Sequence, residues 1–182
     1  MKATQLSFQG VYVIEPVIYG DQRGFFMESY NEQKLKEYGI TFNFIQDNQS
    51  LSAEAGVIRG LHYQLYPKAQ TKLIRVISGA IYDVIVDIRR NSSTFGQWVG
   101  VILSEHNHRQ LLVPKGFAHG FCTLLPNTQV LYKVDEYYAS EHDRGILWND
   151  PALGIDWPTT NPILSDKDKL HPALKEAEIN FD

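Results

Sequence analysis

The chain has 182 residues, which is the length of one globular domain, since domains usually hold about 100 to 200 residues. Apolar residues make up 43% of it and charged residues 21%, a composition too apolar for an intrinsically disordered protein. The net charge of −4, without any basic run, argues against a protein that binds a nucleic-acid backbone.

Three further features narrow the class of protein. Residues 1–149 carry 14 basic and 14 acidic side chains, whereas residues 150–182 carry 3 and 7, so the acidic surplus lies in the C-terminal segment. Cys122 is the only cysteine, which excludes an internal disulfide and a cysteine-rich zinc site. The longest apolar run, residues 11–14, is far shorter than the ~20 residues of a membrane span. We therefore expect a cytoplasmic protein with neither membrane nor nucleic-acid partners.

Short apolar segments separated by turn residues run along most of the chain, at the spacing of strands in a β-sandwich or barrel. Two-residue turns, Ser78-Gly79 and Pro126-Asn127, each separate two of these segments as the turn of a tight hairpin would. The predicted strands are residues 11–14, 24–30, 42–47, 56–64, 72–77, 80–88, 98–103, 110–113, 116–124 and 129–138.

Helices are few in this pattern. Asn31 is a favourable N-cap for a helix over residues 32–38, and Gly39 can end that helix in the left-handed conformation. A second short helix is expected over residues 173–177. Because strands and helices do not alternate, we predict an all-β fold, an antiparallel jelly-roll β-barrel with a few short helices, in a single domain over residues 1–182.

Two histidines lie inside apolar strands, where an imidazole is either a hydrogen-bonded core residue or a functional group. His62 follows Arg59 by three positions, so strict alternation would place the two side chains on opposite faces of the strand. Both can face one cavity only if Gly60 forms a bulge. His119 is the second such histidine.

Lys72 shares a strand face with Ile74 and Val76, which would place an ammonium among apolar side chains. Such a lysine needs an anionic partner or a lowered pKa. The alternative is an edge lysine whose aliphatic stem reaches to water.

Two further sets of polar residues are expected to face inward. Asp83 falls on an apolar strand face, and a buried carboxylate there needs a partner, for which His119 or Lys72 are candidates. Tyr132 and Tyr138 share one face of the predicted strand over residues 129–138, so both phenols could point into the barrel.

Residues 114–120 have the Pro-x-Gly-x-x-His form of the second cupin motif, in which the histidine, here His119, is a metal ligand in some members. The first motif would need His-x-His followed by Glu, but the corresponding segment here is His62-Tyr63-Gln64, with no Glu before Leu103. Two imidazoles are too few for a stable metal site, so we expect a cupin-like barrel without a metal. A metal-dependent cupin oxygenase is the alternative.

From about residue 20 to residue 168, the chain resembles the dTDP-4-dehydrorhamnose 3,5-epimerases. The resemblance rests on the combination and order of several segments, such as Arg-Gly-Leu-His-Tyr-Gln at residues 59–64, rather than on any one of them. The others are residues 20–26, 46–48, 70–73, 95–98, 114–121, 131–133, 147–150 and 164–168.

The resemblance implies a cofactor-independent isomerase of dTDP-L-rhamnose biosynthesis, which supplies cell-surface polysaccharide. Its substrate would be a dTDP-4-keto-6-deoxy sugar inverted at carbons 3 and 5. By similarity, His62 is the base, Tyr132 the acid and Lys72 the cation that stabilises the enolate. Asp168 would hold His62, which implies that the irregular segment 150–182 folds back onto the site.

The resemblance also implies a set of substrate-binding residues and a homodimer whose N-terminal edge strands meet. Asp143 stands where the family usually has Glu, so its contact with substrate is an open question. The substrate-binding residues carried over are Arg23, Phe26, Glu28, Gln46, Asp47, Asn48, Arg59, His119, Tyr138, Asp143 and Lys167. Two other functions stay open, a mono-epimerase that acts at one carbon and a sugar-nucleotide binding module with an inactive site.

Overall fold

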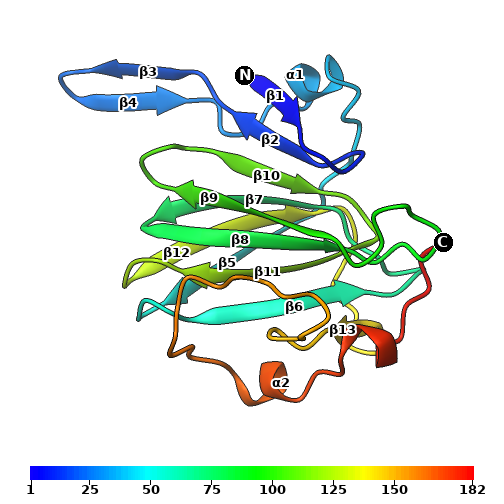
Figure 1. Cartoon of the computed structure of the whole chain (residues 1–182). Coiled ribbons are helices and arrows are strands. Elements are labelled where there is room, and N and C mark those ends of the chain that lie inside the picture. Colours follow the sequence, from blue (N-terminus) through cyan, green and yellow to red (C-terminus); the bar gives the residue numbers. More distant parts are fainter.

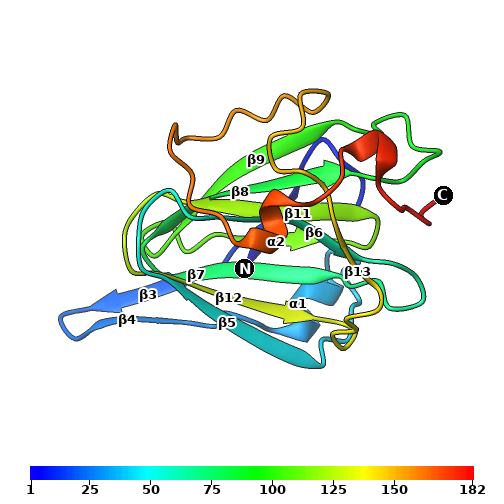
Figure 2. The ribbon, with the colours of Figure 1, turned by 90° about the horizontal axis from the view of Figure 1, so that it is seen from below.

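The computed structural model describes all 182 residues, and two antiparallel sheets face each other in it (Figures 1 and 2). This arrangement confirms the predicted all-β jelly roll. The six-stranded sheet has the order β1 (Lys2–Gln5), β2 (Tyr12–Glu15), β10 (Gln110–Val113), β7 (Lys72–Ser78), β12 (Thr128–Val134) and β5 (Gln46–Ser52). The five-stranded sheet has the order β13 (Asp143–Gly145), β6 (Ile58–Gln64), β11 (Phe117–Thr123), β8 (Ala80–Asp87) and β9 (Trp98–Ser104).

A separate hairpin and three short helical segments complete the fold. The hairpin of β3 (Ile18–Asp21) and β4 (Gly24–Met27) projects from the body of the molecule (Figure 1). The helices are α1 (Glu32–Lys36), α2 (Asp166–Lys169) and a 3₁₀ segment, η1 (Leu174–Glu176). None of them has the length and apolar character of a membrane span.

Neither predicted hairpin forms. Ser78-Gly79 carries the chain from β7 in the six-stranded sheet to β8 in the five-stranded sheet, and Pro126-Asn127 carries it back from β11 to β12. The two crossings touch, because a Cβ on Gly79, which has φ +83°, would lie 2.3 Å from Thr128 Oγ1. A two-residue connection suits a hairpin and a corner between sheets equally well. The pairing of each strand with strands distant in sequence decides between them.

Some strands begin or end at other residues than predicted, because a strand extends only as far as the neighbouring strands that pair with it. The predicted strand over residues 129–138 stops at Val134, because Val134 pairs with Gln46 and Lys72, the first residues of β5 and β7. Tyr138 therefore does not share the inward face of Tyr132. For the same reason of pairing, β5 starts at Gln46 and replaces the predicted strand over residues 42–47.

Helix α1 forms where its capping residues predict it. The Asn31 side chain accepts a hydrogen bond from the Lys34 backbone N–H at 3.1 Å, and Gly39 takes φ +75° just beyond the helix. The predicted helix over residues 173–177 is the single 3₁₀ turn η1.

Two apolar layers lie on the two faces of the five-stranded sheet. Between the sheets, Ile74, Ile81, Ile85, Leu103 and Leu111 are fully buried. On the outer face, the sheet packs against the irregular C-terminal segment, which crosses it in the view of Figure 2. The contacting residues include Leu61, Val84 and Val86 of the sheet and Ile146, Leu153, Ile179 and Phe181 of the segment. The acidic tail is thus anchored by apolar side chains rather than free in solvent.

The connection after β8 is organised by one buried carboxylate. Asp87 is fully buried and accepts hydrogen bonds from the Arg89 guanidinium, from Ser92 Oγ at 2.7 Å and from Thr94 Oγ1 at 2.6 Å. Burial by itself would raise the pKa of Asp87, but these hydrogen bonds outweigh it and lower the pKa to about 2.

This lowered pKa makes the contribution of Asp87 to stability depend on pH. Because the unfolded state binds the proton more tightly, the contribution is complete above about pH 4 and is lost as the pH falls toward 2. We expect Asp87→Asn to lower the free energy of unfolding by roughly 2 kcal/mol at pH 7 and by about half as much at pH 3. Urea denaturation at both values measures this. Asp166→Asn, at an exposed carboxylate, is the control, and an equal loss from Asp87→Asn at both pH values would contradict the role of its charge.

Candidate active site

A cavity of about 420 Å³ opens between the two sheets and is closed on one side by the segment that carries α2. Polar side chains from both sheets and from α2 reach it. The lining residues are Ser50, Val57, Ile58, Arg59, His62, Lys72, His119, Phe121, Tyr132, Ile163, Leu164, Ser165, Lys167 and Asp168.

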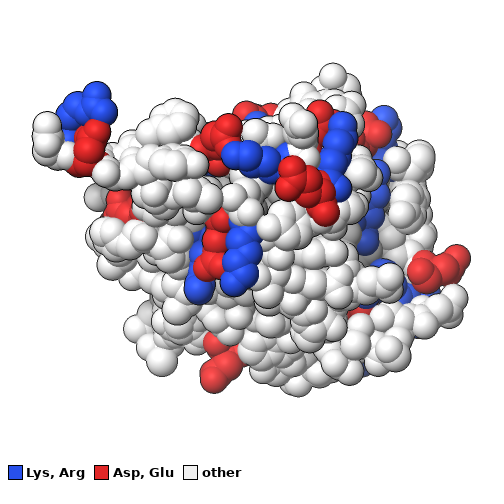
Figure 3. Space-filling model, turned by 90° about the horizontal axis from the view of Figure 1, so that it is seen from above, with Lys and Arg blue, Asp and Glu red and all other residues white.

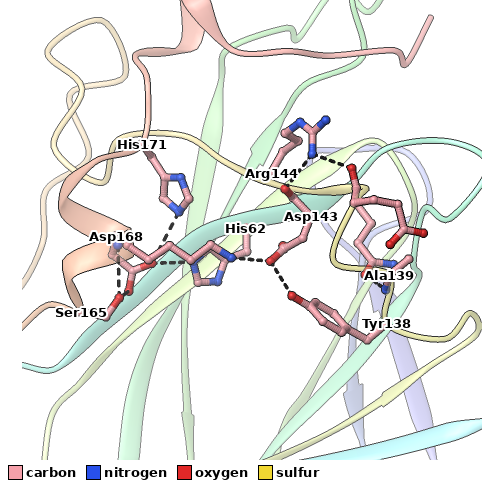
Figure 4. A network of polar contacts seen from close by, with 11 residues as sticks. His62, Tyr138, Ala139, Asp143, Arg144, Ser165, Asp168 and His171 are labelled. Atoms are coloured by element: carbon pink, nitrogen blue, oxygen red, sulfur yellow. Dashed lines mark hydrogen bonds and ion pairs between the residues drawn. The ribbon is translucent and has the colours of Figure 1, made fainter.

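The centre of the site is a hydrogen bond between His62 and Asp168 (Figure 4). His62 Nε2 lies 2.5 Å from Asp168 Oδ1, and Asp168 is only 3% exposed. Ser165, the N-cap of α2, donates its hydroxyl to the other carboxylate oxygen at 2.9 Å. Burial raises the pKa of Asp168, but the hydrogen bond and charge of His62 and the bond from Ser165 lower it more, so the group is a carboxylate. The contact occupies Nε2 and leaves Nδ1 of His62 for a proton from another group.

Arg59 and His62 both line the cavity because β6 bulges between them. The pairing of β6 with β11 shifts register between His119 and Phe121, and Gly60 takes φ +133°. A Cβ at Gly60 would lie 2.5 Å from Gly120 Cα and 2.9 Å from the His119 carbonyl oxygen. The predicted bulge is confirmed, and only glycine fits its conformation and its space.

Lys72 begins β7 and points into the cavity, as its apolar strand face predicts. No carboxylate lies within ion-pair distance of its ammonium. Burial lowers the pKa of Lys72 to about 8, although the charges of Asp143 and Asp83 favour the protonated form. The group is therefore mostly cationic at pH 7 and uncommitted to a partner in the protein.

Tyr132 faces the cavity from β12, in the sheet opposite to that of His62. Burial raises the pKa of its phenol, and the charge of Arg59 opposes this only in part. The hydroxyl is therefore protonated at neutral pH and can act as an acid. A molecule between the sheets would have an imidazole on one side and a phenol on the other.

His119 lines the cavity beside His62, its partner across β6 and β11. Its Nε2 lies 2.5 Å from Oδ1 of Asp83, which is fully buried. The prediction that Asp83 pairs with His119 or Lys72 is confirmed for His119. This contact fixes the orientation of the second imidazole.

The segment over residues 46–48 divides between the two faces of β5. Gln46 and Asn48 point to the same side as Ser50, which lines the cavity, and the Gln46 amide donates to Asn48 Oδ1 at 2.8 Å. Asp47 points to the other side, where it pairs with Lys133 at 2.9 Å. The structure therefore does not bring the Asp47 side chain to the cavity, because alternate residues of a strand face opposite ways.

Three predicted residues meet at the rim. Asp143 accepts hydrogen bonds from the Tyr138 hydroxyl at 3.1 Å and from the Lys167 ammonium (Figure 4). Tyr138 is 59% exposed, and Lys167 lines the cavity. Asp143 is thus held within this chain by two partners next to the mouth of the cavity.

Arg23 and Phe26 belong to the β3–β4 hairpin and Glu28 directly follows it, and all three lie away from the cavity because the hairpin extends outward. Arg23 pairs with Asp21 at the exposed turn of the hairpin, and the projecting tip carries this basic and acidic pair (Figure 3). Phe26 is 66% exposed, and Glu28 pairs with Lys34. Within one copy of the chain these residues do not join the site.

His171 is not among the predicted site residues. Its side chain is 9% exposed, its Nε2 lies 3.7 Å from Asp168 Oδ1, and its ring stands edge-on to His62 with centroids 5.5 Å apart. The signal for it is the spacing Asp168-x-x-His171, since residues three apart at a helix face the same side.

His62, Asp168 and His171 have their ligand atoms within 4.8 Å of one another, a spacing that suggests a metal site. However, His62 Nε2 and Asp168 Oδ1 are in direct hydrogen-bond contact at 2.5 Å. An ion bonded to both at about 2.0 to 2.2 Å would hold these atoms farther apart. The geometry is that of a hydrogen-bonded pair.

Comparison with known proteins points to one family. The sequence profile of the dTDP-4-dehydrorhamnose 3,5-epimerase family matches residues 5–176. The enzyme of that name from Pseudomonas aeruginosa is 51% identical over 180 residues, which are 98% of each chain. The crystal structure of the Bacillus anthracis enzyme, with TDP and PPi bound, has a TM-score of 0.93 at 63% identity and covers 94% of this chain and 98% of its own. A Legionella pneumophila epimerase in complex with dTDP-4-keto-L-rhamnose has a TM-score of 0.92 at 47% identity, over 96% of this chain and 93% of its own.

The bulge at Gly60 can be tested directly. Gly60→Ala should lower the free energy of unfolding by more than the ~1 to 3 kcal/mol of backbone strain alone, because the new Cβ would also meet the backbone of Gly120. The variant should also lose turnover, since Arg59 and His62 could no longer face one cavity. Gly154→Ala is the matched control, as Gly154 has φ +59° with open space around it. Urea denaturation and turnover are measured for both, and similar small losses would show that the close approach at Gly60 is unimportant.

Proposed function

The chain belongs to the dTDP-4-dehydrorhamnose 3,5-epimerase family, and on this premise we propose how the residues of its cavity carry out the reaction. The protein is an isomerase that converts dTDP-4-dehydro-6-deoxy-D-glucose to dTDP-4-dehydro-L-rhamnose, a step of dTDP-L-rhamnose biosynthesis. Carbons 3 and 5 of the sugar flank the ketone, so the C–H bond at each is acidic. Each inversion needs a base on one face of the ring and an acid on the other.

The observation that carries the proposal is the placement of His62 and Tyr132 on opposite sheets, across one cavity. Nδ1 of His62 removes the proton from the carbon next to the ketone. Asp168 accepts the hydrogen bond from Nε2, fixes the tautomer and stabilises the imidazolium that forms. Tyr132 then donates its hydroxyl proton to the same carbon from the opposite face, and exchange with solvent restores both groups before the second carbon reacts.

Lys72 supplies the charge that the intermediate needs. As each proton leaves, negative charge develops on the ketone oxygen, and a cation in a site shielded from water stabilises this enolate. The Lys72 ammonium is cationic at pH 7, lines the cavity and has no ion-pair partner that would have to be displaced.

The diphosphate of the substrate is proposed to lie near Arg59, Lys167 and His119 at the wall of the cavity. The Arg59 guanidinium donates only to neutral oxygens, Ser52 Oγ and the Leu51 carbonyl, each at 3.3 Å. Its charge is therefore available for phosphate oxygens. We propose that the remainder of the substrate contacts Gln46, Asn48, Tyr138 and Asp143. The Asp47 side chain cannot contact it, because it points to the opposite face of β5.

We also propose a homodimer in which the hairpin of one copy completes the cavity of the other. The hairpin projects from the body of the molecule and exposes three aromatic side chains, Tyr19, Phe25 and Phe26, each at least 57% accessible, although the ring of His108 lies 4.7 Å from that of Phe25. A second copy related by two-fold symmetry would cover both hairpins at once. Arg23, Phe26 and Glu28 would then act in the partner's site. The presence of one cysteine is consistent with a cytoplasmic location.

Deuterium exchange separates the roles of the acid and the base. In heavy water, the wild-type protein should incorporate label at carbons 3 and 5 of the keto sugar, as observed by NMR. His62→Ala should abolish exchange at both carbons. Tyr132→Phe should slow product formation by about 10² to 10⁴ while exchange persists, because exchange needs only the base.

Tyr66→Phe, which alters an exposed phenol outside the cavity, should behave as wild type in this experiment. Equal loss of exchange and product in Tyr132→Phe would contradict the acid role. Label at a single carbon in the wild-type protein would instead point to a mono-epimerase.

Subunit complementation tests the shared site. Arg23→Ala and His62→Ala should each be nearly inactive alone, but refolding an equal mixture should restore about a quarter of wild-type activity, since half of the dimers would carry one intact site of two. A mixture of Arg59→Ala with His62→Ala is the control. It should recover nothing, because both residues belong to the same cavity. Failure of the first mixture to recover activity would show that Arg23 does not act across an interface.

A further inference from the structure

His171 lies against the proposed catalytic pair without lining the cavity. Its ring is perpendicular to that of His62 to within 15°, since the interplanar angle is 75°, and it approaches Asp168 from just beyond α2. Figure 4 shows the two imidazoles on two sides of the same carboxylate. His171 can therefore affect the reaction only through its neighbours.

The fold leaves space for this imidazole. Gly145 of β13 pairs with His62 of β6, and a Cβ on Gly145 would lie 2.4 Å from Nε2 of His171 and 2.5 Å from two of its ring carbons. Any other residue at position 145 would have to displace the ring from its place beside Asp168. The glycine at this point of the sheet and the histidine are thus complementary in shape.

The buried nitrogen of His171 identifies its tautomer. Nε2 is inaccessible to solvent and has no hydrogen-bond partner, and Asp168 Oδ1, at 3.7 Å, is an anionic oxygen facing it. A lone pair on Nε2 would be repelled by this carboxylate, whereas an N–H group would be attracted to it. The hydrogen of neutral His171 is therefore on Nε2, with its positive end directed at Asp168.

Burial, together with the charge of His62, keeps His171 neutral. The groups that face it are His62 from β6, Lys167 and Asp168 from α2, and Asp143 from β13. Burial lowers the pKa of His171, and the charge of His62 lowers it further, while the two carboxylates oppose the shift only in part. Of the two imidazoles that contact Asp168, His171 is therefore the one held in the neutral form.

We propose that His171 is a positioning residue, whose Nε2–H restrains Asp168 and weakens the hold of that carboxylate on the proton of His62. This inference rests on the proposed role of His62 as the base. The direction of this effect on His62 follows from the dipole of the Nε2–H group of His171. Its positive end lies near Asp168 and opposes a second positive charge on His62. Loss of the N–H group should therefore make His62 bind its proton more tightly and move the acid limb of kcat/KM to higher pH.

Two variants distinguish the N–H group from the packing of the ring. His171→Phe keeps an aromatic ring beside His62 but removes the donor. It should shift the acid limb of kcat/KM to higher pH by about half a unit, so that the loss of kcat/KM relative to wild type is roughly threefold greater at acidic pH than on the plateau of the profile. His171→Gln keeps an N–H group that can reach Asp168 and should leave the limb near its wild-type position. His106→Phe, at an exposed histidine in the β9–β10 turn, is the matched control and should change nothing.

The NMR titration midpoint of His62 is measured in the same variants without substrate, so that the test does not depend on turnover. An unchanged midpoint and acid limb in His171→Phe, or equal shifts in the Phe and Gln variants, would overturn the proposal. If His171→Phe does not fold, His171→Leu provides the same comparison with the Gln variant. Failure of the proposed function is a different result, because His62→Ala would then retain deuterium exchange whatever the titration shows.

Discussion

The hydrogen bond between His62 and Asp168 joins two parts of the molecule that are distant in sequence and different in structure. His62 belongs to a regular strand of the five-stranded sheet, and Asp168 belongs to an irregular segment that reaches the site 106 residues later. Apolar contacts of that segment with the outer face of the sheet hold α2 in place. Because Asp168 is buried and also bonded to Ser165, its carboxylate has a single orientation in which to meet the imidazole. The chemistry of the cavity therefore depends on packing on the far side of the sheet.

The geometry of β6 places the rest of the site around this bond. The bulge at Gly60 turns Arg59 to the face of His62, so that the proposed phosphate-binding cation and the proposed base lie on one wall of the cavity. Lys72 and Tyr132 reach the opposite wall from neighbouring strands of the other sheet. A jelly roll suits a reaction that needs groups on both faces of a sugar ring, because its two sheets present side chains toward each other at a fixed separation.

The charges that matter for the substrate are those of the side chains at the cavity. The chain carries a net −4, yet its substrate is a diphosphate. The cavity itself holds Arg59, Lys72 and Lys167, while most of the carboxylates near it are already engaged, Asp168 with His62, Asp83 with His119 and Asp143 with Lys167. Pairing each acid with a base of the protein leaves the positive charge of Arg59 and Lys72 for the ligand. Net charge is a poor guide here because a site of this size responds to the few groups within a few ångströms of it.

The class of fold, the helix capped by Asn31, the bulge at Gly60 and the pairing of Asp83 with one of two bases could all be predicted before the structure was known. Each of these follows from local rules, namely alternation along a strand, the capping of a helix end, and the cost of burying an uncompensated charge. The resemblance to a family added Asp168, which no local pattern could link to His62. The folded structure was needed to show that Ser78-Gly79 and Pro126-Asn127 cross between sheets, that Asp47 faces away from the cavity, and that Tyr138 lies at its rim. It also brought His171 to the proposed catalytic pair and left Arg23 outside the cavity. These outcomes depend on which distant strands pair and where they end, and strand pairing is set by contacts between residues far apart in the chain rather than by the residues next to each position.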